Sequence, residues 1–218
     1  KDENGIGGDD LYQLEFLYQT YQLAQKDIST SVTVPILWDK QNKTIVNNES
    51  SEIIRIFNDA FNDLTGNSLD YYPKNLQAPI NELNELIYSN VNNGVYLSGF
   101  AKGQKAYEEA VLNLFKTLDL LEKRLEGQDF LVGNRLTEAD LRLIPTLLRF
   151  DPVYVTHFKC NLKRIKDYKN LSRYTKSLYE LEAVKKTTNF DHIKRHYYYS
   201  HEMLNPQRII PLGPKDIF

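Results

Sequence analysis

The sequence has very little cysteine: Cys160 is the single one among 218 residues. A lone cysteine excludes an internal disulfide and a cysteine-based metal cluster. Sparse cysteine is also typical of proteins in a reducing compartment, so we expect a cytoplasmic protein.

Long hydrophobic runs and an excess of one charge are lacking too. No segment approaches the roughly 18 apolar residues that cross a membrane, which predicts a soluble protein. The 27 Lys and Arg residues stand against 29 Asp and Glu residues, giving a net charge of -2. That balance gives no indication of a nucleic-acid groove or of an anionic membrane surface as a partner. We therefore expect small molecules as partners, with no nucleic acid and no membrane.

The amino-terminal part of the chain has the pattern of a small α/β unit. Apolar residues near helical spacing predict a helix over 11–26, and the β-branched and aromatic run 32–38 predicts a strand with Pro35 at its beginning or on an edge. A short second strand follows over 44–46, and then a helix over about 50–64. Two strands leave an open edge that proteins usually cover, so we expect a further segment in front to complete the unit.

The rest of the chain has the pattern of helices only. Residues 66–74 are predicted to be a linker, and helical periodicity without strand signals follows it. The clearest helix start is a capping box formed by Thr137 and Asp140. The predicted helices span 75–91, 105–125, 138–150, 171–181 and 191–197. The expected fold class is therefore α+β followed by all-α, with one domain over 1–65 and an all-helical domain over 74–218.

Several long strings in the chain match the pattern of one protein family. These strings are NNGVY at 92–96, LTEADLRL at 136–143, RFDPVYVTHFKCN at 149–161, NFDHIKRHYYYSH at 189–201 and PLGP at 211–214. In them the sequence resembles the glutathionyl-hydroquinone reductases, the xi-class or omega-like glutathione transferases. The resemblance implies a partial thioredoxin-like glutathione-binding domain, an all-α transferase C-terminal domain, glutathione as co-substrate and a homodimer. It implies an enzyme that reduces glutathionyl-hydroquinones to hydroquinones by thiol transfer.

The sequence departs from the family at the residue that performs its chemistry. Family members carry a Cys-Pro-Trp stretch on the first strand-to-helix turn of the thioredoxin-like domain, and the sequence contains no such stretch. Cys160 lies in the helical part, and we interpret it as a small buried apolar residue, not as the nucleophile. We expect the reductase chemistry in a complete protein that includes the missing cysteine.

Three residues of the α/β unit are candidates for glutathione binding. Glu49 and Ser50 stand at a predicted helix start, where free backbone N–H groups and the helix dipole attract an anion. The resemblance implies that they bind the γ-glutamyl end of glutathione. It also implies that Val34, before a cis Pro35, pairs through its backbone with the cysteinyl part. The alternative is ordinary helix N-capping by Asn48, Ser50 or Ser51 without a ligand.

Tyr96 and Tyr197 are the candidate catalytic residues of the helical part. The resemblance implies that they flank the substrate sulfur and the quinol oxygen. A phenol can donate a hydrogen bond to a developing thiolate or quinol oxygen. The alternative is that each is a half-buried packing residue with a satisfied hydroxyl. Tyr198 and Tyr199 adjoin Tyr197, which leaves open which of the three faces the site.

His192 and His196, with Asp191 and His201 nearby, raise the question of a metal site. His192 and His196 are four residues apart on one helix face, a spacing that can bind zinc, but no HEXXH motif and no further strong ligand accompany them. We expect no metal and interpret both as structural hydrogen-bonding groups. Arg149, Asp151 and His157 are expected to fasten the helical core in the same way.

Two other functions stay open at this point. The first is a non-catalytic transferase-like protein that binds partners through its helical domain, because Glu49 and Ser50 are present while the family nucleophile is not. The second is an ordinary transferase that activates glutathione with a serine or a tyrosine. Both depend on which residue occupies the turn that family members fill with Cys-Pro-Trp.

Overall fold

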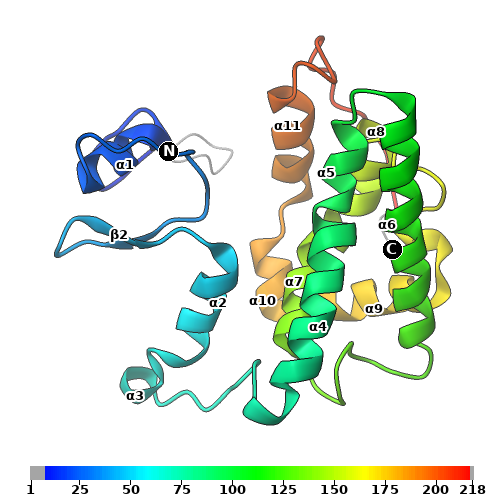
Figure 1. Cartoon of the computed structure of the whole chain (residues 1–218), viewed down its shortest axis with the longest axis horizontal. Helices are drawn as coiled ribbons and strands as arrows, with labels where there is room; N and C mark the ends of the chain where they lie inside the picture. Colours follow the sequence, from blue (N-terminus) through cyan, green and yellow to red (C-terminus); the bar gives the residue numbers. More distant parts are fainter. Residues whose placement is uncertain (1–7, 217–218) are drawn as a thin grey trace. The chain divides into compact units, whose positions relative to one another are not determined.

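The computed structural model describes residues 8–216. By their contacts these residues divide into two compact units, one that ends at Asp70 and one that begins at Tyr71 (Figure 1). The helices and the sheet of each unit are described separately below. None of the helices within 8–216 is both long and apolar enough to cross a membrane.

From residue 8 to Asp70, the first unit forms a two-stranded antiparallel sheet and three short helices. Trp38 of β1 pairs with Ile45 of β2, and Asp39 pairs with Thr44. The Asp39 carboxylate accepts the N–H groups of Gln41 and Asn42, which closes the turn between the strands. The elements are α1 (Leu17–Ala24), β1 (Leu37–Asp39), β2 (Thr44–Asn47), α2 (Ser50–Asp59) and α3 (Asn62–Thr65).

The predicted helix over 11–26 is wrong for its first turns, because α1 begins only at Leu17. The Asp9 carboxylate accepts the N–H groups of Leu11 and Leu14, and Gln13 has a φ of 57°. A non-glycine residue in the left-handed region interrupts a right-handed helix. The local hydrogen bonds of one aspartate thus override an apolar spacing that looked helical.

The predicted strands and the helix after them are partly right. The second strand is confirmed as β2, but β1 covers only the end of the predicted 32–38 run. Earlier in that run the Thr33 backbone is bonded to a side chain: its carbonyl accepts the Tyr21 hydroxyl at 2.8 Å. The helix over 50–64 is divided into α2 and α3, because Phe61 between them has non-helical backbone angles (φ −109°, ψ 5°).

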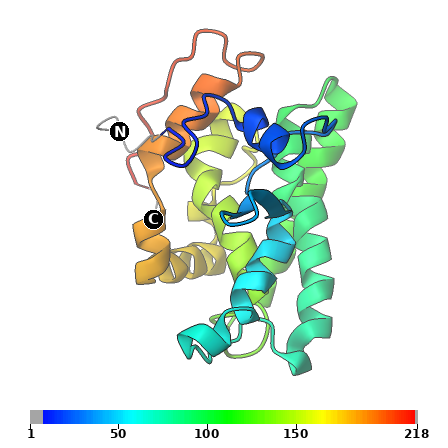
Figure 2. The ribbon, with the colours of Figure 1, turned by 90° about the vertical axis from the view of Figure 1, so that its left-hand side faces the viewer.

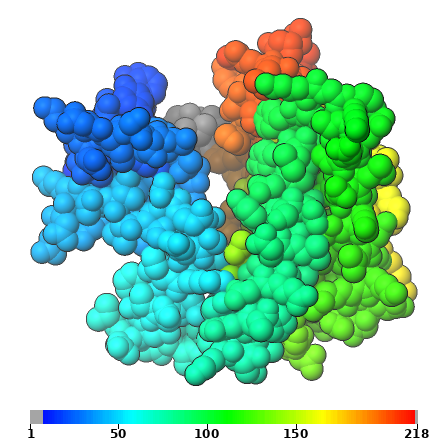
Figure 3. Space-filling view, in the orientation of Figure 1, coloured from blue at the N-terminus to red at the C-terminus, as the bar shows by residue number. Residues whose placement is uncertain are grey.

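The second unit is all-helical, as the sequence predicted. Figure 1 shows α4 and α5 in line with one another and α6 beside them, and the space-filling view in Figure 3 shows these three helices forming one face of the unit. Its elements are η1 (Lys74–Leu76), α4 (Gln77–Ile87), η2 (Tyr88–Asn92), α5 (Gly94–Gly99), α6 (Gln104–Arg124), α7 (Glu138–Arg149), η3 (Phe150–Tyr154), α8 (Val155–His157), η4 (Ile165–Asp167), α9 (Lys169–Tyr179), α10 (Glu182–Thr187) and α11 (Phe190–Ser200).

The predicted helices of this unit are present close to their expected positions, and the structure adds helices that were not predicted. The capping box at the start of α7 is confirmed. The helix over 105–125 is confirmed as α6, within one residue at each end. The sequence reading missed α5 and α10. After α11 the chain passes beyond the helix end and returns alongside it, where Leu212 accepts a hydrogen bond from Lys194 (Figure 2).

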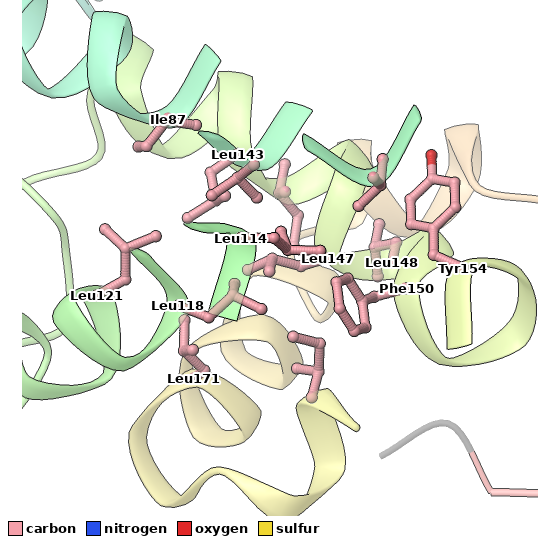
Figure 4. Packing of buried hydrophobic residues seen from close by; sticks show 14 of the residues in the cluster. Ile87, Leu114, Leu118, Leu121, Leu143, Leu147, Leu148, Phe150, Tyr154 and Leu171 are labelled. Carbon is pink, nitrogen blue, oxygen red and sulfur yellow. The ribbon is translucent and has the colours of Figure 1, made fainter. Parts of the chain in front are cut away.

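The core of this unit lies between α4, α6, α7 and α9. Figure 4 shows leucines of α6 and α7 packed together with Phe150 and Tyr154, all of them buried. The rings of Phe115 and Phe150 meet edge to face at 6.0 Å. Segment η3 follows α7 directly and has the wider turn of a π-helix. All five residues of η3 are buried, Tyr154 among them at 2% exposure.

Candidate functional site

Three phenols from three elements form a hydrogen-bonded chain in the second unit. The Tyr96 hydroxyl of α5 lies 2.6 Å from the Tyr197 hydroxyl of α11. The Tyr197 hydroxyl in turn lies 2.9 Å from the Tyr154 hydroxyl of η3. Both distances are within the usual range for O–H···O hydrogen bonds. The two tyrosines singled out in the sequence are therefore neighbours although 101 positions separate them.

The three phenols differ in exposure. Tyr154 and Tyr197 are buried, whereas Tyr96 is 37% exposed. Burial is the main cause that raises the pKa of both Tyr154 and Tyr197 far above the usual phenol value, so both remain neutral at physiological pH. When Tyr154 donates to Tyr197 and Tyr197 donates to Tyr96, the Tyr96 hydrogen is left free for a ligand. The chain can thus present one phenol supported by two buried ones.

Phe158 is the packing centre of this group. Its ring is fully buried, and its centroid lies 5.3 Å from Tyr96, 5.4 Å from Tyr154 and 5.9 Å from Tyr197. Gly99, at the end of α5, makes this approach possible, because a β-carbon there would lie 2.4 Å from the Phe158 ring. The close contact between α5 and the end of α8 therefore depends on the absence of a side chain at Gly99.

The run of three tyrosines on α11 divides into three different environments. Tyr197 joins the phenol chain. Tyr198 is buried and donates its hydroxyl to the Pro152 carbonyl at 3.3 Å. Tyr199 is exposed, with the Arg208 guanidinium 4.5 Å from its ring centroid. Of the three, Tyr197 alone has its hydroxyl bonded in the phenol chain.

Sequence reasoning did not single out Tyr154. The residue lies inside the family-like string RFDPVYVTHFKCN, so the string carried a signal for it. Nothing in its spacing separates Tyr154 from the many packing tyrosines of the chain. All five residues of η3 are buried, and the Tyr197 hydroxyl that contacts Tyr154 lies 43 positions away on another helix, so local spacing does not mark Tyr154.

The three predicted glutathione-binding residues lie in the first unit. The Val34–Pro35 peptide bond is cis, as expected, and Val34 is exposed. Ser50 is the first residue of α2 and Glu49 is its N-cap. The Glu49 carboxylate accepts the Ser51 N–H at 3.1 Å and the Ser51 hydroxyl at 3.0 Å. The cap of α2 is therefore Glu49, not Asn48, Ser50 or Ser51 as the capping alternative expected. Both Glu49 and Ser50 are exposed at a helix start that attracts anions.

Cys160 is buried, as the sequence interpretation expected. Its thiol is fully buried, with the Val95 carbonyl 3.9 Å and the Phe158 carbonyl 3.8 Å away. Burial raises the pKa of the thiol to about 12, although Ser98 and Lys159 act in the opposite direction. The thiolate that a nucleophile requires is therefore scarce at neutral pH.

The histidine and carboxylate candidates divide between surface and core. His196 is exposed, and its ring meets the Tyr197 ring edge to face at 5.3 Å. Asp151 is buried and accepts the N–H groups of Ile165 and Lys166, which fastens η3 to η4. Burial raises the pKa of this carboxyl group. Within 8–216, no group of three His, Cys, Asp or Glu side chains is arranged to hold a metal ion.

Comparison with known proteins identifies relatives along almost the whole chain. Residues 104–177 match the glutathione S-transferase C-terminal domain model. The chain is 56% identical to the glutathionyl-hydroquinone reductase YqjG of Escherichia coli over 96% of its own length and 64% of that protein. It is 53% identical to the glutathionyl-hydroquinone reductase PcpF of Sphingobium chlorophenolicum, over 97% of this chain and 70% of that protein.

Solved structures agree with these matches. The glutathione-bound structure of YqjG from Escherichia coli superposes with a TM-score of 0.97 at 54% identity, covering 100% of this chain and 71% of that one. The xi glutathione transferase of Phanerochaete chrysosporium gives 0.96 at 54% identity, covering 98% and 74%. The expected fold class, a small β/α unit before an all-α transferase domain, is confirmed. The chain belongs to the xi-class glutathione transferases, the family of the glutathionyl-hydroquinone reductases.

Proposed function

We propose that this chain supplies most of the substrate-binding part of a glutathione-dependent reductase that converts glutathionyl-hydroquinones to hydroquinones. The observation that carries the proposal is the phenol chain Tyr154–Tyr197–Tyr96, which ends in a partly exposed hydroxyl. Support also comes from two relatives that are named glutathionyl-hydroquinone reductases and are more than half identical to this chain.

The proposed reaction is a thiol exchange in two steps. A cysteine thiolate attacks the sulfur of the glutathionyl-hydroquinone, so that a disulfide to glutathione forms and the carbon–sulfur bond breaks. The electron pair of that bond remains on the ring carbon, which takes up a proton and gives the free hydroquinone. A second glutathione thiolate then attacks the mixed disulfide, which releases the cysteine thiolate and glutathione disulfide.

In this scheme the phenol chain acts on the quinol. Tyr96 directs its free hydrogen to the ring carbon that receives the electron pair, and so supplies the proton as the carbon–sulfur bond breaks. The hydrogen bond from Tyr197 stabilises the charge that builds up on the Tyr96 oxygen, and Tyr154 supports Tyr197 in the same way. Because both supporting phenols are buried, this arrangement needs little reorganisation during the reaction.

The nucleophile of the scheme is not among the residues described above. Cys160 is excluded because its thiol is buried and its pKa is raised to about 12. The reaction requires a Cys-Pro-Trp segment of the family type, and the chain without it binds glutathione conjugates and does not turn them over. Binding of glutathione conjugates without turnover is the second candidate function. An assay of hydroquinone release with the Cys-Pro-Trp segment supplied distinguishes it from the reductase function.

Replacing Tyr96 with phenylalanine is expected to reduce kcat/KM for hydroquinone release about 100-fold, because one positioned proton donor is lost. The enzyme for this measurement is the chain with a family Cys-Pro-Trp segment fused in front, and hydroquinone is quantified by chromatography. Tyr199→Phe is the matched control, because Tyr199 is an exposed phenol that lies against Arg208. Equal rates for the two variants would remove the phenol chain from the mechanism.

Replacing Glu49 with glutamine is expected to weaken glutathione binding about fivefold. The amide oxygen of glutamine still accepts from Ser51, which preserves the cap, while the charge that would pair with the glutathione ammonium is removed. An exposed ion pair contributes roughly 1 kcal/mol or less, which sets the size of the effect. Affinity is measured by titration calorimetry on the same fusion protein.

The matched measurement for Glu49→Gln is the thermal unfolding midpoint, which should stay unchanged because the cap is retained. Ser50→Ala serves as the companion variant and should weaken binding by a smaller factor, through one lost hydroxyl hydrogen bond. Wild-type affinity in both variants would contradict the assignment of glutathione to the start of α2.

A further inference from the structure

Two imidazoles fasten the end of α11 outside the phenol chain. His157, in α8, is only 6% exposed, and its Nε2 lies 3.1 Å from Nδ1 of His201, the C-cap residue of α11. The two rings are nearly parallel, at 13°, with 5.3 Å between centroids. A hydrogen bond between two imidazole nitrogens needs a hydrogen on one and a lone pair on the other. The contact therefore requires that at least one of the two rings is neutral.

The two imidazole rings contact the rings of the buried tyrosines of α11. The His157 ring is 4.6 Å from the Tyr198 ring, and the His201 ring is 5.6 Å from the Tyr197 ring. The His201 ring also meets Phe100, the C-cap residue of α5, edge to face at 5.2 Å. Tyr197 is one helical turn before His201, so what holds His201 also holds the turn that carries Tyr197. The pair thus joins the last turn of α11 to α8 and α5.

The groups that face the pair favour the neutral form of His157. Burial is the largest cause, followed by His201 and Lys159, and together they lower the pKa of His157 to about 4, while the Tyr197 backbone acts in the opposite direction. Burial, and then His196, lower the pKa of His201. The remaining titratable neighbours are Tyr197 and Tyr198, whose pKa values burial raises, so neither carries charge in acid.

We propose that the His157–His201 pair is a positioning device for Tyr197. While one imidazole is neutral, the pair holds the last turn of α11 in place. When both are protonated, two positive N–H groups face each other, the contact opens and the hydrogen bond from Tyr197 to Tyr96 loosens. The relevance to catalysis rests on the proposed function, but the device itself is a property of the fold and is tested without turnover.

The pH range over which His157 affects folding stability follows from the direction of its pKa shift. A histidine whose pKa is lower in the folded than in the unfolded state stabilises the fold above the unfolded value, near 6.5. That contribution is lost as the pH falls toward about 4. From pH 7.5 to 4.5 the folded-to-unfolded ratio should fall roughly a hundredfold through His157 alone. Urea unfolding of wild type and of His157→Gln measures this, and the variant should lack that share of the pH dependence.

The Tyr197 hydroxyl contact is monitored by NMR on the full chain, labelled with 13C at the tyrosine ζ-carbon. The Tyr197 signal is assigned with Tyr197→Phe, and long-range 1H–15N spectra follow His157 and His201. In wild type the Tyr197 signal should shift between pH 7 and pH 4.5 in parallel with the imidazole titration. In His201→Gln, which keeps a polar partner that cannot be charged, the signal should stay at its neutral-pH position. The matched control is His192→Gln, near the start of the same helix, which should behave as wild type.

Two outcomes overturn the proposal: a Tyr197 signal that does not move with pH in wild type, or one that moves equally in His201→Gln. If His157→Gln does not fold, His201→Gln still decides, because His201 is only partly buried. The spectra are recorded on the chain itself and do not depend on reductase activity, which is measured on the fusion protein. A failure of the proposed function is therefore distinguishable from a failure of the positioning device.

Discussion

Replacing Asp140 with alanine is expected to lower the free energy of unfolding by about 3–5 kcal/mol. The carboxylate is fully buried at the start of α7 and accepts four hydrogen bonds. Oδ1 accepts from the Leu131 N–H at 2.9 Å and the Tyr174 hydroxyl at 2.8 Å. Oδ2 accepts from the Thr137 N–H at 2.8 Å and its hydroxyl at 2.9 Å. Alanine leaves these donors buried without an acceptor, and each such donor costs about 1–3 kcal/mol before the structure relaxes.

The measurement is urea unfolding at neutral pH, with Asp129→Ala as the matched control. Asp129 is exposed and pairs with Arg173 on the surface, so its loss should cost less than about 0.5 kcal/mol. Asp140→Asn should fall between the two, because one amide oxygen still accepts while the NH2 group faces donors. A loss below about 1 kcal/mol for Asp140→Ala would mean that water or rearranged side chains replace the carboxylate.

The start of α7 was predictable because its signals are local. Thr137 and Asp140 are three positions apart, and their reciprocal hydrogen bonds involve only the turn that contains them. Helix α6 was predictable for a related reason: within its 21 residues, the buried ones from Val111 to Leu121 recur with helical spacing. Such patterns fix an element without knowledge of the rest of the fold.

The phenol chain was not predictable from local signals. Tyr96 and Tyr197 were proposed from the family resemblance, and no spacing rule joins residues 101 positions apart. Tyr154 was missed because its partner Tyr197 lies 43 positions away on another helix. The helix predicted over 11–26 begins later than expected, because the hydrogen bonds of Asp9 override an apolar spacing that favours a helix. Tertiary and side-chain contacts thus decided the site, whereas periodicity decided most helices.

Replacing Gly99 with alanine is expected to cost about 3 kcal/mol of stability and to disturb the phenol chain. The added β-carbon would lie 2.4 Å from two ring atoms of Phe158, closer than any relaxed contact. Phe158 is fully buried, so its ring has no free space into which it can turn. Overpacking of a filled core forces shifts of backbone and side chains at a cost of 1–3 kcal/mol or more. Because that ring also touches Tyr96 and Tyr197, the shift reaches the hydroxyl contacts.

The matched control makes the same substitution on the same helix. At Gly94 a β-carbon would meet Leu114 at 3.6 Å, an ordinary contact, so Gly94→Ala should be neutral or stabilising by up to about 1 kcal/mol. Urea unfolding gives the stabilities, and near-ultraviolet circular dichroism reports the tyrosine environments. Phe158→Leu in the Gly99→Ala background should recover part of the loss, because a smaller side chain makes room for the methyl group. Equal stability of Gly99→Ala and Gly94→Ala would mean that α5 moves away from α8 at little cost. The distances within the phenol chain would then not depend on that contact.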